Sequence, residues 1–184
     1  AERGEWADTL ARALVALHAD APEDHPVNPF RGVPLAARTG AVEERLRTLR
    51  AGGLLDDTSA DAVHALWQAG LAAAPWDRTP VWIHGDLHPG NLVTRHGTLA
   101  AIIDFGDVTA GDPAYDLAVA WLAFDAAGRA RFIAAAGSGY DIDVWVRARA
   151  WAAAVVLMLL AHSDDNPAYF ALGRDAATEV LADA

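Results

Sequence analysis

The stretch from residue 84 to residue 107 constrains this chain more than any other part of its sequence. It reads HGDLHPGN, then a mainly apolar run, then IDFGD. The short apolar run 81–83 before it predicts a buried strand, and the glycines and proline that follow predict a loop. Two apolar segments flank His96-Gly97, a pair that favours a tight hairpin turn because glycine accepts a positive φ.

This hairpin is expected to gather polar side chains. With the turn at 96–97, opposed residues are equally distant from it, so Asn91 is predicted to lie across from Ile102. Asp104 then points to the same face, two residues further on. Diagonal neighbours on one face lie roughly 7–8 Å apart, close enough to share one cation. Asp86 sits on the loop that leads into the hairpin, so the spacing predicts a single site.

The three predicted site residues are Asp86, Asn91 and Asp104, and all carry side-chain oxygens. Oxygen ligands of this kind suit Mg²⁺ beside a phosphate. Each residue alone also fits an ordinary role, as a turn aspartate, a turn cap or a solvated strand exit. Their agreement in register favours a functional site over three unrelated polar residues.

A second interpretation of the same stretch is a metal-dependent hydrolase. The spacing His84-x-Asp86-x-His88 is that of a dinuclear metal hydrolase motif. The other histidines show no recognisable ligand spacing: His18, His25, His64, His96 and His162. We therefore expect His84 to be a buried residue that supports the loop through its ring nitrogens.

The composition is that of a globular protein of one or two compact units. The chain has 184 residues, 53% hydrophobic and 21% charged. It has no cysteine, which excludes disulfides and thiolate zinc sites and is compatible with the cytoplasm. No basic and apolar leader pattern opens the chain, and the apolar run 151–161 is shorter than the roughly 20 residues that span a bilayer. We expect a cytoplasmic protein with no membrane partner, and a buried helix at 151–161.

The charge balance bears on the partners. The formal net charge is −11, which argues against nucleic acid and favours a cationic small molecule, although solubility alone also accounts for it. All 14 basic residues are arginine. Together with the many alanines, this usage suggests a GC-rich bacterial genome.

Apolar periodicity predicts a mostly helical chain around the hairpin. The segment 20–34 carries four prolines and is expected to be a loop over the surface. Asp57, Thr58 or Ser59 is expected to cap the third helix, and Asp112 the fourth. The predicted helices cover 6–19, 35–50, about 57–74, 112–124, 127–136, 143–162 and about 166–181. The fold class is therefore α+β and predominantly helical, in a single unit.

Three segments resemble the aminoglycoside phosphotransferase (choline kinase-like) family. Residues 84–91 are similar to its catalytic loop, residues 103–107 to its metal segment, and residues 111–118 to the start of its next helix. The strong similarity covers about 82–124. It implies the C-terminal lobe of a protein kinase-like phosphotransferase with a small catalytic β-hairpin.

The resemblance also assigns roles. Asp86 would be the catalytic aspartate that orients a substrate hydroxyl, while Asn91 and Asp104 would hold Mg²⁺ on the phosphates of ATP or GTP. Asp107 would assist near the metal, and Asp112 would brace the catalytic loop, although a turn and a helix cap explain these two equally well. The other supporting residues would be His84 and His88.

Related enzymes phosphorylate aminoglycosides, macrolides, choline and other small alcohols. The resemblance therefore implies a small-molecule hydroxyl acceptor, with a role in antibiotic resistance among the expectations. Asp125 and Asp141 are the candidates for cationic groups of such an acceptor. Most aromatic residues in that region are expected to be core.

The sequence departs from the family near its start. Members carry an N-terminal, mostly β lobe with a lysine that contacts phosphate, whereas this chain has no lysine and begins in predicted helices. We expect residues 1–184 to be the C-terminal lobe, with the nucleotide-binding lobe absent from this chain and little activity in isolation. The alternative is a non-catalytic small-molecule-binding module.

Overall fold

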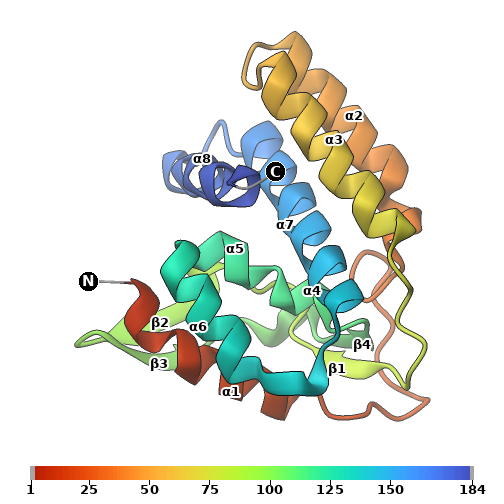
Figure 1. The fold of residues 1–184 in the computed structure, drawn as a ribbon, viewed down its shortest axis with the longest axis vertical. Coiled ribbons are helices and arrows are strands. Elements are labelled where there is room, and N and C mark those ends of the chain that lie inside the picture. Colours follow the sequence, from red (N-terminus) through yellow and green to blue (C-terminus); the bar gives the residue numbers. More distant parts are fainter. Residues whose placement is uncertain (1–2, 183–184) are drawn as a thin grey trace.

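One long helix, α7 (Ile142–His162), runs through the middle of the molecule (Figure 1). The computed structural model describes residues 3–182. Within this part, α7 alone is long and apolar enough to cross a bilayer, and 72% of its 18-residue apolar window is buried inside the fold. That burial is what a core helix requires, as the apolar run 151–161 predicted. Its main helical neighbours are α2 (Thr39–Ala51), α3 (Asp57–Ala72), α4 (Ala114–Leu117) and α8 (Pro167–Leu181).

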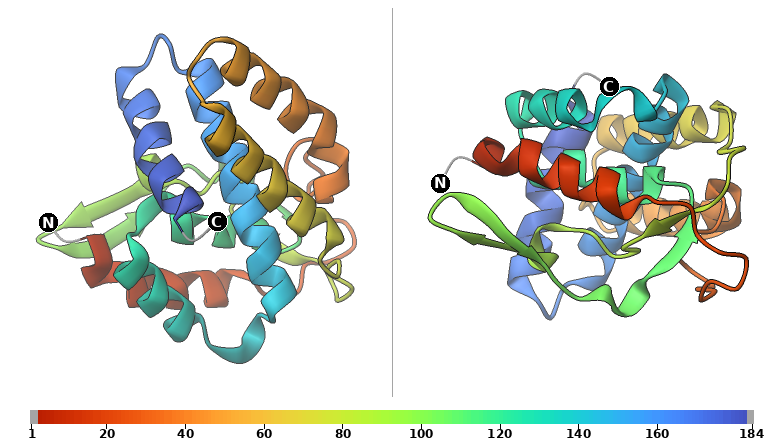
Figure 2. Two further views of the ribbon diagram at one scale, coloured as in Figure 1. Left: turned by 45° about the horizontal axis from the view of Figure 1, so that its top comes forward. Right: turned by 90° about the horizontal axis from the view of Figure 1, so that it is seen from below.

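Two groups of elements flank α7. Figure 2 shows α8 on one side of α7 and the antiparallel pair α2–α3 on the other. Below them, α1 (Ala7–Leu17) packs against α6 (Ala126–Ala136), which follows the short α5 (Val119–Ala123). Single 3₁₀ turns complete the helical part at Arg3–Trp6, Leu35–Arg38, Pro89–Asn91, Phe105–Asp107 and Gly137–Gly139.

The strands form two small antiparallel sheets. The strands β1 (Val81–Ile83) and β4 (Thr109–Gly111) form one pair, and β2 (Leu92–Arg95) and β3 (Thr98–Ile102) form the predicted hairpin. The strand β4 was not predicted, because three residues ending in glycine carry no strand pattern of their own. Its pairing with β1 brings the segment after the hairpin back beside the start of the catalytic loop.

The predicted predominantly helical α+β class is confirmed, with small differences at element ends. Asp56, rather than one of the next three residues, caps α3, since its carboxylate accepts the Ser59 N–H at 2.7 Å. The helix predicted over 112–124 divides at Ala118 into α4 and α5. The segment 20–34 is free of regular helix, as its prolines predicted.

The hairpin turn lies at the predicted residues. The strand pairing at the open end of the hairpin differs from the prediction. His96 and Gly97 both have positive φ, 52° and 76°, as a tight turn of this kind needs. Beyond the turn, a bulge at Ala100 shifts the pairing by one residue. Leu92, not Asn91, therefore lies opposite Ile102. The predicted shared face of Asn91 and Asp104 does not follow from regular strand alternation.

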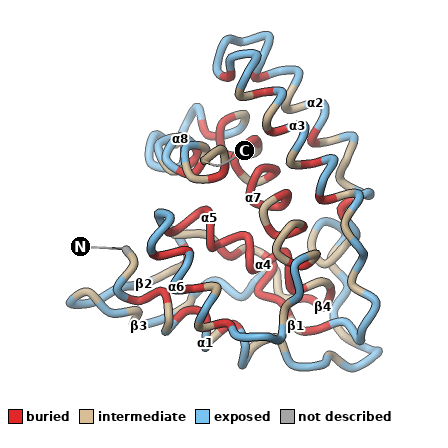
Figure 3. The backbone as a smooth tube through the Cα atoms, viewed as in Figure 1, coloured by how far each residue is buried: buried red, intermediate tan, exposed pale blue. Residues whose placement is uncertain are grey.

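The buried core lies where α4, α5 and the middle of α7 meet (Figure 3). Aromatic side chains fill much of it: the Trp151 ring on α7 meets Tyr115 at 4.7 Å and Trp67 on α3 at 6.0 Å between ring centroids, both edge-on. Gly70 allows α3 to approach α7 closely, because a Cβ there would overlap the Cβ of Ala150.

Gly70→Ala tests this close approach. Overpacking of this kind costs about 1–3 kcal/mol, so we expect the free energy of unfolding in urea to fall by that amount. Gly40→Ala, in α2, is the matched control, since nothing lies within 4 Å of its added Cβ. The control should be neutral or slightly stabilising. Equal destabilisation by both changes would contradict the proposed packing.

Candidate active site

The catalytic-loop stretch begins with a turn that only glycine fits. Ile83 at the end of β1 is fully buried, and the next turn places Gly85 at φ +81°. A Cβ at Gly85 would overlap the carbonyl oxygen of Asp107, so the loop lies directly against the segment that follows the hairpin. Residues far apart in sequence, 86 and 107, are thereby brought together.

The buried carboxylate of Asp116 holds this loop in place. It accepts the His84 N–H at 2.7 Å and the Gly85 N–H at 3.1 Å, with His18 Nε2 at 3.3 Å. Asp116 is fully buried, and the other ring nitrogen of His18 is 2.7 Å from the Tyr140 hydroxyl. The catalytic loop is therefore held in place by the carboxylate of Asp116, a residue of α4.

This arrangement corrects the role suggested for Asp112. Its Oδ1 accepts the Ala114 N–H at 3.0 Å, which is the expected local cap. Its Oδ2 accepts from Arg147 Nε at 2.6 Å, so its remaining partner lies on α7 and not on the catalytic loop. The brace of the loop is Asp116, which the sequence analysis left as structural because a polar residue in the first turn of a helix has an ordinary explanation.

His84 joins the two halves of the site. Its ring is fully buried; Nδ1 accepts the Asp86 N–H at 3.2 Å, and Nε2 donates to the Ile103 carbonyl at 2.8 Å. These bonds assign the neutral tautomer with the proton on Nε2. Both nitrogens have partners, so His84 offers none to a metal. In residues 3–182 no group of three histidine, cysteine or acidic side chains is placed to hold a metal ion, and the hydrolase alternative gains no support.

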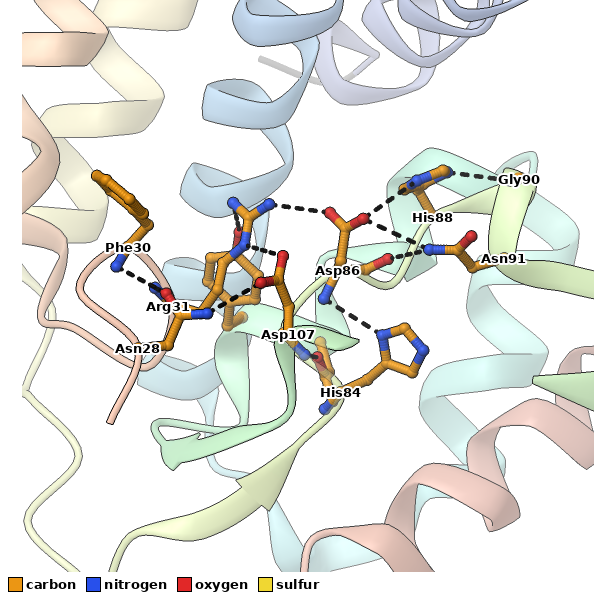
Figure 4. A network of polar contacts seen from close by, with 12 residues as sticks. Asn28, Phe30, Arg31, His84, Asp86, His88, Gly90, Asn91 and Asp107 are labelled. Carbon is orange, nitrogen blue, oxygen red and sulfur yellow. Dashed lines mark hydrogen bonds and ion pairs between the residues drawn. The ribbon is translucent and has the colours of Figure 1, made fainter. Parts of the chain in front are cut away.

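Asp86 lies at the centre of a polar network (Figure 4). Its Oδ1 accepts from the Arg31 guanidinium at 3.1 Å. Its Oδ2 faces His88 Nε2 at 3.6 Å, an ion-pair distance rather than a hydrogen bond. The side chain keeps 30% of its surface exposed, so one carboxylate can be both held in place and reached from solvent.

Arg31 is the residue that the sequence analysis missed. It comes from the proline-rich segment 20–34, and besides Asp86 it donates to Asp107 Oδ2 at 3.2 Å and to the Tyr115 hydroxyl at 2.8 Å. Asn28 fixes the segment, since its oxygen accepts the Arg31 N–H at 3.1 Å and its nitrogen donates to Asp107 at 3.0 Å. No periodicity marks a loop residue, so its contacts could not be read from sequence.

The charges in this network change proton affinities. The facing His88 ring lowers the pKa of Asp86; burial opposes this, and Arg31 adds to the lowering. Burial raises the pKa of Tyr115 to about 12, which keeps its phenol protonated at neutral pH. Asp86 is therefore an ionised acceptor near neutrality.

Asn91 and Asp104 lie at the open end of the hairpin, Asn91 just before β2 and Asp104 just after β3. The Ile103 N–H donates to the Asn91 carbonyl at 3.0 Å, so Asp104 is one residue from a backbone contact with Asn91. Asp104 adopts a left-handed conformation, φ 62° and ψ 63°, which turns the chain out of β3. The turn, and not strand alternation, directs its carboxylate.

The free oxygens of these two residues suit a hard cation. The Asn91 amide nitrogen donates to the Asp86 carbonyl at 2.8 Å, which leaves Oδ1 as the free oxygen. Within residues 3–182, neither Asn91 Oδ1 nor the exposed Asp104 carboxylate makes a hydrogen bond or an ion pair. Unpaired carboxylate and amide oxygens are the ligand set that Mg²⁺ accepts.

The remaining candidates have structural partners. His88 Nδ1 accepts the Gly90 N–H at 3.0 Å, and its ring meets Tyr169 edge-on. Asp125 caps α6 by accepting the Gly128 N–H at 2.8 Å. Asp141 caps α7 and lies 3.5 Å from Arg78. Neither of these two carboxylates contacts the described network around Asp86, so the structure does not bring them into the site.

The sequence profile of the phosphotransferase enzyme family matches residues 1–151. The match covers most of the chain, and the chain therefore belongs to this family. Among curated proteins, none matches the sequence.

Solved phosphotransferases share the fold. The GDP complex of wild-type aminoglycoside 2'-phosphotransferase-IIIa has a TM-score of 0.66 and 22% identity, over 98% of this chain and 62% of that one. The apoenzyme of macrolide 2'-phosphotransferase MphH from Brachybacterium faecium has a TM-score of 0.56 and 18% identity, over 96% and 61% of the two chains. The chain thus has the fold of the matching part of these kinase-like proteins and spans less than two thirds of their length.

Asp116→Asn tests the anchor of the catalytic loop. The amide can present only one acceptor oxygen where the carboxylate served two N–H groups, and a buried unsatisfied group costs about 1–3 kcal/mol. We expect that loss in the free energy of unfolding measured in urea. Asp165→Asn, an exposed aspartate before α8, is the control and should change it little. Equal values for the two variants would contradict the bracing role.

The lowered pKa of Asp86 predicts a signed pH effect. Because the folded-state pKa lies below the unfolded value of about 3.9, the unfolded chain binds more protons on acidification. The stability that the Asp86 charge contributes is present above about pH 5 and is lost as pH falls through the folded-state pKa. The measurement is the difference in free energy of unfolding between wild type and Asp86→Asn from pH 6 to pH 3. A difference that stays level throughout would show that the carboxyl is unperturbed.

Proposed function

We propose that this chain is the catalytic and acceptor-binding part of an O-phosphotransferase that acts on a hydroxyl of a small molecule. The observation that carries the proposal is the arrangement around Asp86. The carboxylate of Asp86 is held and ionised, and Asn91 beside it donates to the Asp86 carbonyl. Asp104 follows Ile103, whose N–H donates to the Asn91 carbonyl, and the free oxygens of Asn91 and Asp104 suit Mg²⁺. Membership of the phosphotransferase family supports the same reaction.

In this proposal Asp86 positions the acceptor. An acceptor hydroxyl donates to a carboxylate oxygen of Asp86, and this directs its lone pair toward the phosphoryl donor. An aspartate with a lowered pKa is a weak base, so orientation contributes more than early proton removal. The partners on Oδ1 and Oδ2 fix the carboxylate, which leaves the hydroxyl little freedom of direction.

The metal would be held by Asn91 and Asp104. A cation held there would supply positive charge that offsets the charge developing on the transferred phosphate. The protein's own contribution is the hairpin, which presents both side chains from its ends. The hydrogen bond from the Asn91 amide to the Asp86 carbonyl links the metal ligand to the catalytic loop.

We propose ATP or GTP as the donor. Similar structures were solved with GDP and with ADP, which supports a nucleotide. The lysine that the family uses on phosphate is not among these 184 residues. We infer that the residues binding the nucleotide belong to a further lobe. The chain alone is therefore proposed to transfer phosphate slowly. We also propose that the protein works in the cytoplasm.

The acceptor is proposed to be a small alcohol of the kind that related enzymes phosphorylate. Similar structures include a kanamycin complex at a TM-score of 0.67 and a gentamicin complex at 0.52. These complexes support a small-molecule acceptor, whether an aminoglycoside-type antibiotic or another alcohol. A non-catalytic binding module is the alternative, and a lack of any Mg²⁺-dependent transfer by the full-length protein would favour it.

Asp86→Ala in the natural full-length protein tests the reaction. Loss of a positioning and base residue costs about 10²–10⁴-fold, so transfer of the γ-phosphate of ATP or GTP should fall by that factor. The assay follows Mg²⁺-dependent transfer to a panel of hydroxyl acceptors. Asp165→Asn should retain full turnover. Undiminished turnover of Asp86→Ala would overturn the proposal.

A further inference from the structure

A small pocket lies beside Arg31, between α2, α7 and the segment 20–34. Three of the side chains that line it are arginines: Arg31, Arg38 and Arg45. Such a cluster is unexpected in a chain with a net charge of −11. Arg31 also touches Asp86, at 3.1 Å, so the pocket adjoins the proposed catalytic carboxylate.

The charges of the three arginines are balanced to different degrees. Arg31 is paired with two carboxylates, those of Asp86 and Asp107. In the described part of the chain, Arg38 and Arg45 have no carboxylate at ion-pair distance. Arg38 lies over the Phe30 ring at 5.4 Å, and Arg45 Nε donates to His162 Nε2 at 3.3 Å. The pocket therefore carries two uncompensated positive charges.

These two charges act on each other. Both guanidinium groups line the same pocket, and burial, together with the smaller effect of Arg38, lowers the pKa of Arg45. Each is half-buried, so water screens the repulsion incompletely. An anion between them would relieve the repulsion and accept several N–H donors at once.

The rest of the pocket limits what such an anion is attached to. Its other walls include Phe30, Trp151 and Met158, which favour an apolar or aromatic body. Its volume of about 30 Å³ is room for two or three heavy atoms, since a water needs roughly 10–15 Å³ on this scale. That space takes the carbon and both oxygens of a carboxylate, or part of a phosphate group with its remaining oxygens outside, and not a whole acceptor.

We propose that the acceptor carries an anionic group, a carboxylate or a phosphate, that Arg38 and Arg45 hold while its hydroxyl reaches Asp86. The proposal rests on the phosphotransferase function and specifies its substrate class. It differs from what the overall charge favours, because the net charge acts at long range and is screened over about 8 Å at physiological salt. Within the pocket, the nearest unpaired charges are positive.

A matched series of three phenylcarbinols tests the charge preference. Mandelate, mandelamide and 2-amino-1-phenylethanol share one alcohol and differ in charge, being anionic, neutral and cationic. Calorimetric titration into the chain without nucleotide should give mandelate an affinity at least about tenfold above mandelamide, the effect of one charge-assisted hydrogen bond. The cationic member and kanamycin should bind more weakly than mandelamide. Phenyl phosphate, titrated separately, ranks phosphate against carboxylate.

Variants assign the preference to the pocket. Arg38→Gln and Arg45→Gln should each reduce the mandelate preference severalfold, and the double variant should abolish it. Arg12→Gln, an exposed arginine on α1, is the matched control and should keep the preference. Circular dichroism of each variant checks that it is folded.

Two results would overturn the inference. One is equal or weaker binding of both anions relative to mandelamide. The other is an anion preference that survives in the folded double variant. Because these titrations need no nucleotide and no turnover, either failure leaves the Asp86→Ala result, and with it the proposed reaction, unaffected.

Discussion

A buried carboxylate, that of Asp116, holds the backbone on which the candidate site is built. A carboxylate removed from solvent is stable only when its oxygens have hydrogen-bond partners. Here two loop N–H groups and the ring of His18 are those partners. The packing of α4 on α7 fixes the carboxylate. The position of Asp86 thus depends on the helical core, although Asp86 itself lies on a loop.

Much of the fold could be predicted because apolar periodicity marks several helices and because polar side chains cap the N-termini of α3, α6, α7 and α8. The hairpin turn was also predictable, since the glycine of His96-Gly97 accepts the positive φ that a tight hairpin turn requires. The strand register beyond the turn was not predictable, because the bulge at Ala100 leaves no mark in the uniformly apolar segment 99–103. The strand β4 depends on a partner distant in sequence, and only tertiary contacts show it.

The site shows the same division between local and long-range information. Asp86, Asn91 and Asp104 lie in local motifs, so they could be proposed as site residues from the sequence. Arg31 reaches the site through a loop held by Asn28 and by a close approach at Gly32, whose added Cβ would overlap the carbonyl oxygen of Ala110. Its pairing with two aspartates balances charges that the sequence alone would leave as an acidic cluster.

The central claim is that Asn91 and Asp104 hold a divalent cation beside Asp86. Mn²⁺, a paramagnetic substitute for Mg²⁺, tests it most directly when titrated with ADP or GDP into the isotopically labelled protein. The account predicts that the amide signals of residues 86, 91 and 104 broaden first, and that Asp104→Asn weakens the effect. Broadening that begins at the caps Asp125 or Asp141, with these three signals unchanged, would contradict it.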